Sequence, residues 1–169
     1  MATGLLLVRL VFGLLMAAHG SQNIFGWFGG YGLTGTGTFF EQLGFRPGRL
    51  FAAAAGWTEF LGGVLLALGL GGPNGPAFIV SVMIVALVSV HRGHGLFAAT
   101  NGIEVPLLYA AAAAALAFTG PGHYSLDAIF GLTSMWTIAN AGIALSLAAL
   151  GAIANLAARR SAVPSRVHA

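Results

Sequence analysis

Three ionisable residues stand inside the first two long apolar stretches of the sequence. Arg9 and His19 lie between Leu5 and Gly20, and Glu59 lies between Leu50 and Leu70. Charged groups persist inside a membrane where they face a protein interior or a wet cavity. A helical rise of about 1.5 Å per residue leaves Arg9 and Glu59 roughly 8 Å apart in depth, so we expect an ion pair. It serves either as a packing lock or as part of a polar pocket in which Glu59 accepts or relays a proton.

Other polar residues are expected at the inner ends of the spans, near the depth of His19. They are His91, Arg92, His94, Asn101, Glu104 and Tyr109. One interpretation is a vestibule on the cytoplasmic side that all of them line together with His19. The alternative is that residues at helix ends are polar because water is there.

Histidine raises the question of metal or haem binding, because imidazole is a common ligand for both. His19 and His91 are the one pair at similar depth, and the sequence has no CxxCH or HExxH motif and no cysteine. We therefore expect no metal site and no haem. Absence of cysteine also excludes dithiol chemistry on this chain. Without a basic run to follow phosphates, we expect no nucleic-acid partner either.

These residues belong to a chain with the composition of an integral membrane protein. Of its 169 residues, 57% are hydrophobic and 7% are charged, against about a quarter charged in soluble proteins. Each of five segments approaches the roughly 20 apolar residues that a helical span needs. They are Gly4 to Ile24, Leu50 to Leu70, Pro76 to Val90, Val105 to Thr119 and Met135 to Ala157. The fold class is therefore an all-α membrane protein.

The arginines predict the orientation of these spans. With five spans, the arginines between segments one and two, between three and four, and after segment five all fall on one side. By the positive-inside rule this side is the cytoplasm, so the amino terminus is outside and the carboxyl terminus inside, in the cell membrane. We expect the first segment to be retained rather than cleaved as a signal peptide, because it has no basic n-region and Arg9 interrupts its apolar run.

The connection between the first two spans, residues 25–49, is long, glycine-rich and aromatic. One interpretation is an interfacial loop whose aromatic rings lie at the headgroup level. The other is a partly re-entrant flap that closes a cavity, which requires protein or water to satisfy its backbone.

The order of these polar and glycine positions resembles the DoxX family of small membrane proteins, over about residues 5–132. The matching positions are Arg9, Phe12-Gly13, His19-Gly20, Phe25-Gly26, Phe39-Phe40, Leu43-Gly44, Pro47, Glu59, Gly62-Gly63, His91, Gly95, Phe97, Gly102, Glu104, Pro106-Leu107 and residues 120–127. The resemblance implies a four-helix membrane domain over residues 1–132. The additional helix in residues 133–158 departs from that pattern and is expected to contact a partner or a second copy. We expect residues 159–169 to form a disordered basic tail.

The resemblance also implies a function, because the family takes its name from a subunit of a thiosulfate:quinone oxidoreductase. Arg9, His19, Glu59, His91 and Glu104 match the family's polar positions, and with Tyr109 they become candidates for a quinone site. Glu59 and His19 are the candidate catalytic groups, because quinone reduction needs proton donors. Partner oxidoreductase subunits or further copies of the chain would complete the assembly. The alternatives are a non-catalytic anchor or assembly factor, and a small lipid-handling or transport protein.

Overall fold

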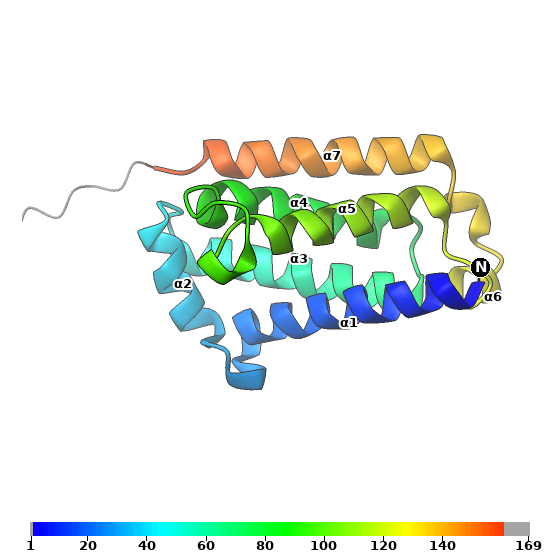
Figure 1. Ribbon diagram of the computed structural model, residues 1–169, viewed down its shortest axis with the longest axis horizontal. Helices are drawn as coiled ribbons and strands as arrows, with labels where there is room; N and C mark the ends of the chain where they lie inside the picture. The colour runs from blue at the N-terminus through cyan, green and yellow to red at the C-terminus, as the bar shows by residue number, and fades with distance from the viewer. Residues whose placement is uncertain (1, 161–169) are drawn as a thin grey trace, which may run out of the picture.

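The structure is a computed structural model that describes residues 2–160. No strand occurs in these residues. The α-helices are α1 (Ala2–Phe25), α2 (Gly32–Gln42), α3 (Gly48–Leu68), α4 (Asn74–Ala86), α5 (Glu104–Thr119), α6 (Leu126–Ile129) and α7 (Ile138–Ala157). They form a bundle in which α1, α3, α4, α5 and α7 lie along one common direction and α2 runs obliquely to them at one end (Figure 1). Short turns of other helix types are η1 (Trp27–Gly29), η2 (Leu87–His91), η3 (Ala98–Thr100) and η4 (Thr133–Met135), of which η2 is a π-helix that continues α4.

Each of the five predicted segments coincides with an apolar helix. Four helices in the described residues are long and apolar enough to cross a membrane: Ala2–Phe25, Gly48–Leu68, Asn74–His91 and Ile138–Ala157. The helix Glu104–Thr119 is also apolar but has 16 residues. The chain is therefore an all-helical, multi-pass membrane protein, as the composition predicts.

Residues 25–49 contain a helix that the sequence analysis did not predict. α2 has the sequence GLTGTGTFFEQ, in which glycine and threonine are poor helix formers. Packing of α2 against α3 and α1 supplies the missing stability. Thr36 and Gly37 are buried in this contact, so residues 32–42 form a packed helix, whereas Trp27, Phe28 and Tyr31 before it are exposed. The position of these rings at the headgroup level stays a prediction.

The most extensive contact between two helices of the described residues joins α1 and α3, which pack antiparallel along a seam of glycines. A Cβ atom placed on Gly13 would lie 2.6 Å from the backbone nitrogen of Ala67, and one on Gly20 would lie 2.5 Å from that of Phe60. Small residues let helix backbones approach closely in a membrane. These two contacts fix the register in which α1 and α3 face each other.

A shared apolar core joins α1, α3, α4 and α5, the four helices of the predicted bundle. Its buried members are Met16, Leu66, Ile79, Met83, Ala113 and Leu116. α7 lies outside this core and packs mainly against α4, with Ala141 and Ala152 fully buried. The division between residues 1–132 and 133–158 stays a prediction. Of the tail predicted to be disordered, Arg159 and Arg160 are instead held by hydrogen bonds to the α2–α3 loop, and residues 161–169 lie outside the described residues.

Candidate functional site

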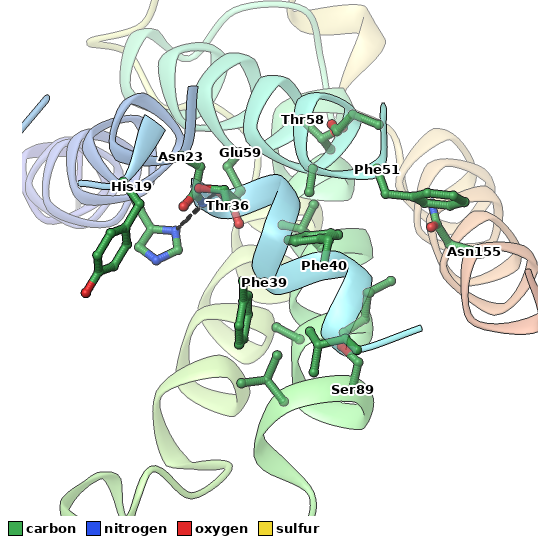
Figure 2. Close-up of a pocket in the computed structure, with 18 of the residues that line it drawn as sticks. His19, Asn23, Thr36, Phe39, Phe40, Phe51, Thr58, Glu59, Ser89 and Asn155 are labelled. Carbon is green, nitrogen blue, oxygen red and sulfur yellow. Dashed lines mark hydrogen bonds and ion pairs between the residues drawn. The ribbon is translucent and has the colours of Figure 1, made fainter. Parts of the chain in front are cut away.

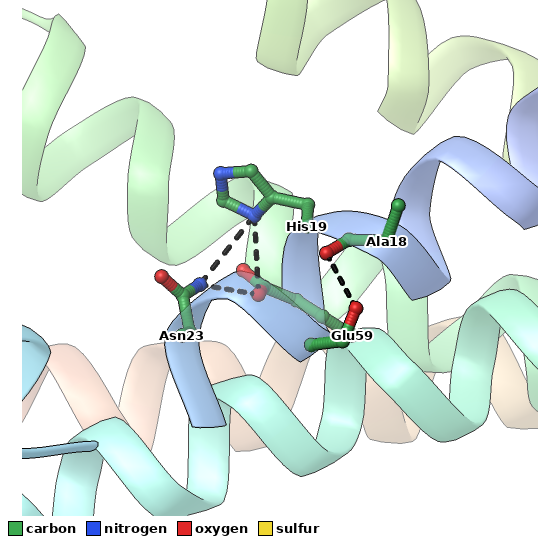
Figure 3. A network of polar contacts seen from close by, with 5 residues as sticks. Ala18, His19, Asn23 and Glu59 are labelled. Atoms are coloured by element: carbon green, nitrogen blue, oxygen red, sulfur yellow. Dashed lines mark hydrogen bonds and ion pairs between the residues drawn. The ribbon is translucent and has the colours of Figure 1, made fainter. Parts of the chain in front are cut away.

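A polar network connects α1 and α3 near the α2 end of the bundle (Figure 3). Oε2 of Glu59 lies 3.2 Å from Nδ1 of His19 and accepts a hydrogen bond of 2.7 Å from Nδ2 of Asn23. Because a carboxylate only accepts, Nδ1 of His19 carries the proton in this pair. The side chain of Glu59 is 8% exposed and that of His19 is 56% exposed. Glu59 is thus the buried anchor and His19 the accessible partner.

Arg9 does not take part in this network, so the predicted Arg9–Glu59 ion pair is wrong. Arg9 is 1% exposed and donates hydrogen bonds to the backbone carbonyls of Pro121 and Tyr124. The glycine seam explains the difference, because its register places Glu59 opposite Gly20 and Arg9 beside Gly69. A Cβ on Gly69 would lie 2.8 Å from Cζ of Arg9. Arg9 and His19 are separated by about 15 Å along α1. Glu59 lies at the level of His19 and is therefore far from Arg9.

Asp127 organises the same end of the bundle as Arg9. Its carboxylate is fully buried and accepts hydrogen bonds from the backbone nitrogens of Gly71, at 3.1 Å, and Gly72, at 2.8 Å. The indole Nε1 of Trp136 donates a third bond of 2.7 Å. These contacts tie the α3–α4 connection to the loops that precede α7. We assign Asp127 a structural role that the sequence analysis did not predict.

The His19–Glu59 pair opens into a cavity of about 620 Å³, which we call the Glu59 cavity (Figure 2). His19, Asn23 and Glu59 provide one polar wall. α2 covers the cavity with residues that include Thr36, Phe39 and Phe40, and α3 adds Phe51 and Thr58. α4 and η2 supply a mixed wall of Val82, Val85, Ser89, Val90 and His91. Pockets of this size with mainly apolar walls and a few polar groups are typical of small-molecule sites.

Of the predicted vestibule, only His19 and His91 line this cavity. Nδ1 of His91 lies 2.8 Å from the backbone oxygen of Asn101. Glu104 instead accepts a 2.7 Å bond from the backbone nitrogen of Ala98, and the ring of Tyr109 packs edge-on against Phe12 at 5.2 Å. Arg92, His94, Asn101, Glu104 and Tyr109 therefore do not form one vestibule with His19.

The sequence analysis overlooked Asn23, Thr36 and Asn155 as cavity residues. Asn23 could have been found, because it lies four positions after His19 and so on the same face of α1. Thr36 and Asn155 gave no such signal. Thr36 depends on the unexpected helix α2, and Asn155 depends on the docking of α7.

The arrangement is suited to proton transfer with a bound polar group. His19 uses Nδ1 for Glu59, and within residues 2–160 its Nε2 makes no hydrogen bond. A histidine oriented in this way by a carboxylate is a common general acid or base. Within the same residues, no group of three or more histidine, aspartate or glutamate side chains is placed to hold a metal ion.

Comparison with known proteins gives a family match. The DoxX family model matches residues 4–92, just over half of the chain. This range contains Arg9, His19, Asn23, Glu59 and His91. Comparison with curated proteins and with solved structures found no match.

Proposed function

Since the chain belongs to the DoxX family of membrane proteins, we propose that it is the membrane subunit of an oxidoreductase complex and provides a quinone or quinol site in the Glu59 cavity. The observation that supports this most directly is the joining of an accessible His19 and a buried Glu59 in one apolar cavity. The cavity offers aromatic and aliphatic walls for a quinone ring and one polar wall for its oxygen.

The proposed chemistry divides between this chain and its partner. A quinone bound here accepts two electrons from a redox cofactor of the partner subunit and two protons, one from His19 and one from water that enters the cavity. His19 exchanges a proton with the quinone oxygen through Nε2, while Glu59 holds the imidazole by Nδ1 and stabilises its protonated form. Asn23 fixes the carboxylate with a second bond. The chain has no cysteine, so thiol or persulfide steps and thiolate-ligated clusters belong to another subunit.

We propose that the protein crosses the cell membrane five times, with the amino terminus outside. α5 is the shortest of the five helices. In this proposal the residues that follow it, from Gly120 onward, complete the distance to the membrane interface. With this topology, Arg46, Arg49, Arg92, Arg159 and Arg160 all follow or precede helix ends at the cytoplasmic side, in agreement with the positive-inside rule. The Glu59 cavity then lies toward the cytoplasmic half of the bilayer.

The proposal is tested by quinone reduction in the native complex purified in mild detergent. His19→Ala and Glu59→Gln should each lower the rate by about 100-fold or more, the usual contribution of a positioned acid or base, while assembly persists. His123→Ala is the matched control, because His123 is exposed and does not line the cavity. Normal quinone reduction in both cavity variants would rule out this site.

A non-catalytic anchor is the second candidate, and one observation favours it. Oε2 of Glu59 already receives two hydrogen-bond partners from within the chain, so the network can serve as a lock between α1 and α3. An anchor requires the network only for folding. It predicts that any substitution that preserves assembly also preserves the activity of the complex, including His19→Ala.

A further inference from the structure

The residues that directly follow α7 contact the loop between α2 and α3. Nε of Arg159 donates a 2.9 Å hydrogen bond to the backbone oxygen of Leu43, and the backbone nitrogen of Arg160 donates one of 2.9 Å to that of Gly44. The guanidinium of Arg159 also lies over the ring of Phe45, 5.4 Å from its centroid. Three separate contacts therefore attach α7 to this loop.

The contacts of Arg159 continue into the wall of the Glu59 cavity. Phe45 is fully buried, and its ring centroid lies 5.6 Å from that of Phe40 and 5.3 Å from that of Phe51. Phe40 and Phe51 both line the cavity. Arg159 thus holds, through Phe45, the two rings that α2 and α3 contribute at this point.

α7 also reaches the cavity directly. The amide side chain of Asn155, one turn before Arg159, is among the lining residues (Figure 2). It is the one lining residue that lies outside residues 4–92, the segment matched by the family. The cavity is consequently incomplete without a helix that the family match does not include.

We infer that residues 155–160, the last turn of α7 and the residues that directly follow it, are part of the ligand site. Arg159 is a positioning residue that keeps α2 closed over the cavity, and Asn155 supplies a polar group that a bound quinone contacts. Only the identity of the ligand rests on the proposed function. The closure of α2 by Arg159 is independent of it and can be measured without a ligand.

The first test measures access to the cavity. Because the chain has no cysteine, Ser89→Cys creates a single thiol in the half-buried cavity wall, and Ala112→Cys creates a half-buried control on α5 outside the cavity. A water-soluble maleimide should label the Ser89→Cys thiol about tenfold faster or more when Arg159→Ala is added, as expected for loss of a charge-assisted hydrogen bond. Arg159→Lys, which keeps the charge but not the planar donor group, should show a smaller increase.

Two results of this test would overturn the closure of α2. One is an unchanged labelling rate at Ser89→Cys in the Arg159→Ala background. The other is an equal acceleration at Ala112→Cys, which would mean that the whole bundle loosens. Faster labelling confined to Ser89→Cys supports the inference.

The second test measures binding of a fully substituted short-chain 1,4-benzoquinone to the otherwise unmodified chain by titration calorimetry. Asn155→Leu should weaken binding about fivefold without changing the labelling rate at Ser89→Cys, because it removes a polar contact and leaves Arg159 in place. Unchanged quinone affinity in Asn155→Leu and Arg159→Ala would refute the ligand role of α7 while the proposed function stands. Absence of quinone binding in the wild-type chain, together with faster labelling in Arg159→Ala, would refute the proposed function while the closure stands.

Discussion

Gly20 of α1 packs directly on the backbone of Phe60 of α3, so closely that a Cβ on Gly20 would lie 2.5 Å from the Phe60 nitrogen. A Cβ on Gly20 would also lie 2.6 Å from the oxygen of Gly56, so Gly20 is level with Thr58, midway between Gly56 and Phe60. Because the two helices are antiparallel, His19, one residue before Gly20, is then level with Glu59, one residue after Thr58. Their 3.2 Å approach is a consequence of that level. The glycine seam therefore positions the candidate site.

Gly20→Ala should destabilise the protein by about 1–3 kcal/mol, the usual cost of overpacking a close contact. The atoms it would meet are backbone atoms of Phe60 and Gly56, which cannot move aside separately from α3. The measurement is unfolding in detergent micelles with increasing sodium dodecyl sulfate. Gly142→Ala on α7 is the control, because a Cβ there meets nothing within 4 Å, and it should be neutral or stabilising. Equal effects of the two substitutions would contradict the packing argument.

Arg9 and Glu59 should behave as independent residues in a double-mutant cycle. Because they share no partner, the unfolding free-energy changes of Arg9→Leu and Glu59→Leu should add to within about 0.5 kcal/mol. The comparison cycle combines His19→Ala with Glu59→Leu and should give a coupling of at least about 0.5 kcal/mol. A coupling energy between Arg9 and Glu59 as large as that of the comparison cycle would support a direct ion pair between them.

Glu59→Gln should fold nearly as well as the wild type, whereas Glu59→Leu should not. Glutamine keeps one side-chain oxygen, which in the place of Oε2 accepts the bonds from both Asn23 and Nδ1 of His19. Leucine leaves both partners without a bond, which costs about 1–3 kcal/mol. Thermal unfolding in detergent compares the two variants. If the Glu59→Leu variant unfolds at the same temperature as the Glu59→Gln variant, the network contributes nothing to folding stability.

Asp127→Asn should destabilise the end of the bundle opposite α2 by about 1–3 kcal/mol. An amide has one oxygen in place of two, and its NH₂ group would face a donor among Gly71, Gly72 and Trp136. Trp136→Phe removes one donor and leaves the other two bonds, so its effect should be smaller. Hydrogen-exchange rates at the amides of Gly71 and Gly72 measure this local loss of stability. Protection of these amides in Asp127→Asn as strong as in the wild type would show that the carboxylate is dispensable.

The composition of the chain and the lengths of its apolar stretches were sufficient to predict its membrane class and the position of each long helix. Both follow from local chemistry, because a bilayer requires apolar stretches of defined length whatever their neighbours are. The same reasoning singled out His19 and Glu59, because ionisable groups are rare inside such stretches. This reasoning did not predict α2, because its glycine and threonine residues form a helix only by packing on α3.

Which charged residues meet was decided by the tertiary structure alone. The depth argument paired Glu59 with Arg9, whereas the register along α1 in the structure pairs Glu59 with His19. That register depends on which glycines of α1 fit against which backbone atoms of α3, a contact between segments far apart in the sequence. The entry of Asn155 into the cavity likewise depends on how α7 docks on α4. Sequence by itself determined which polar groups the membrane must accommodate, and close packing between helices determined their partners.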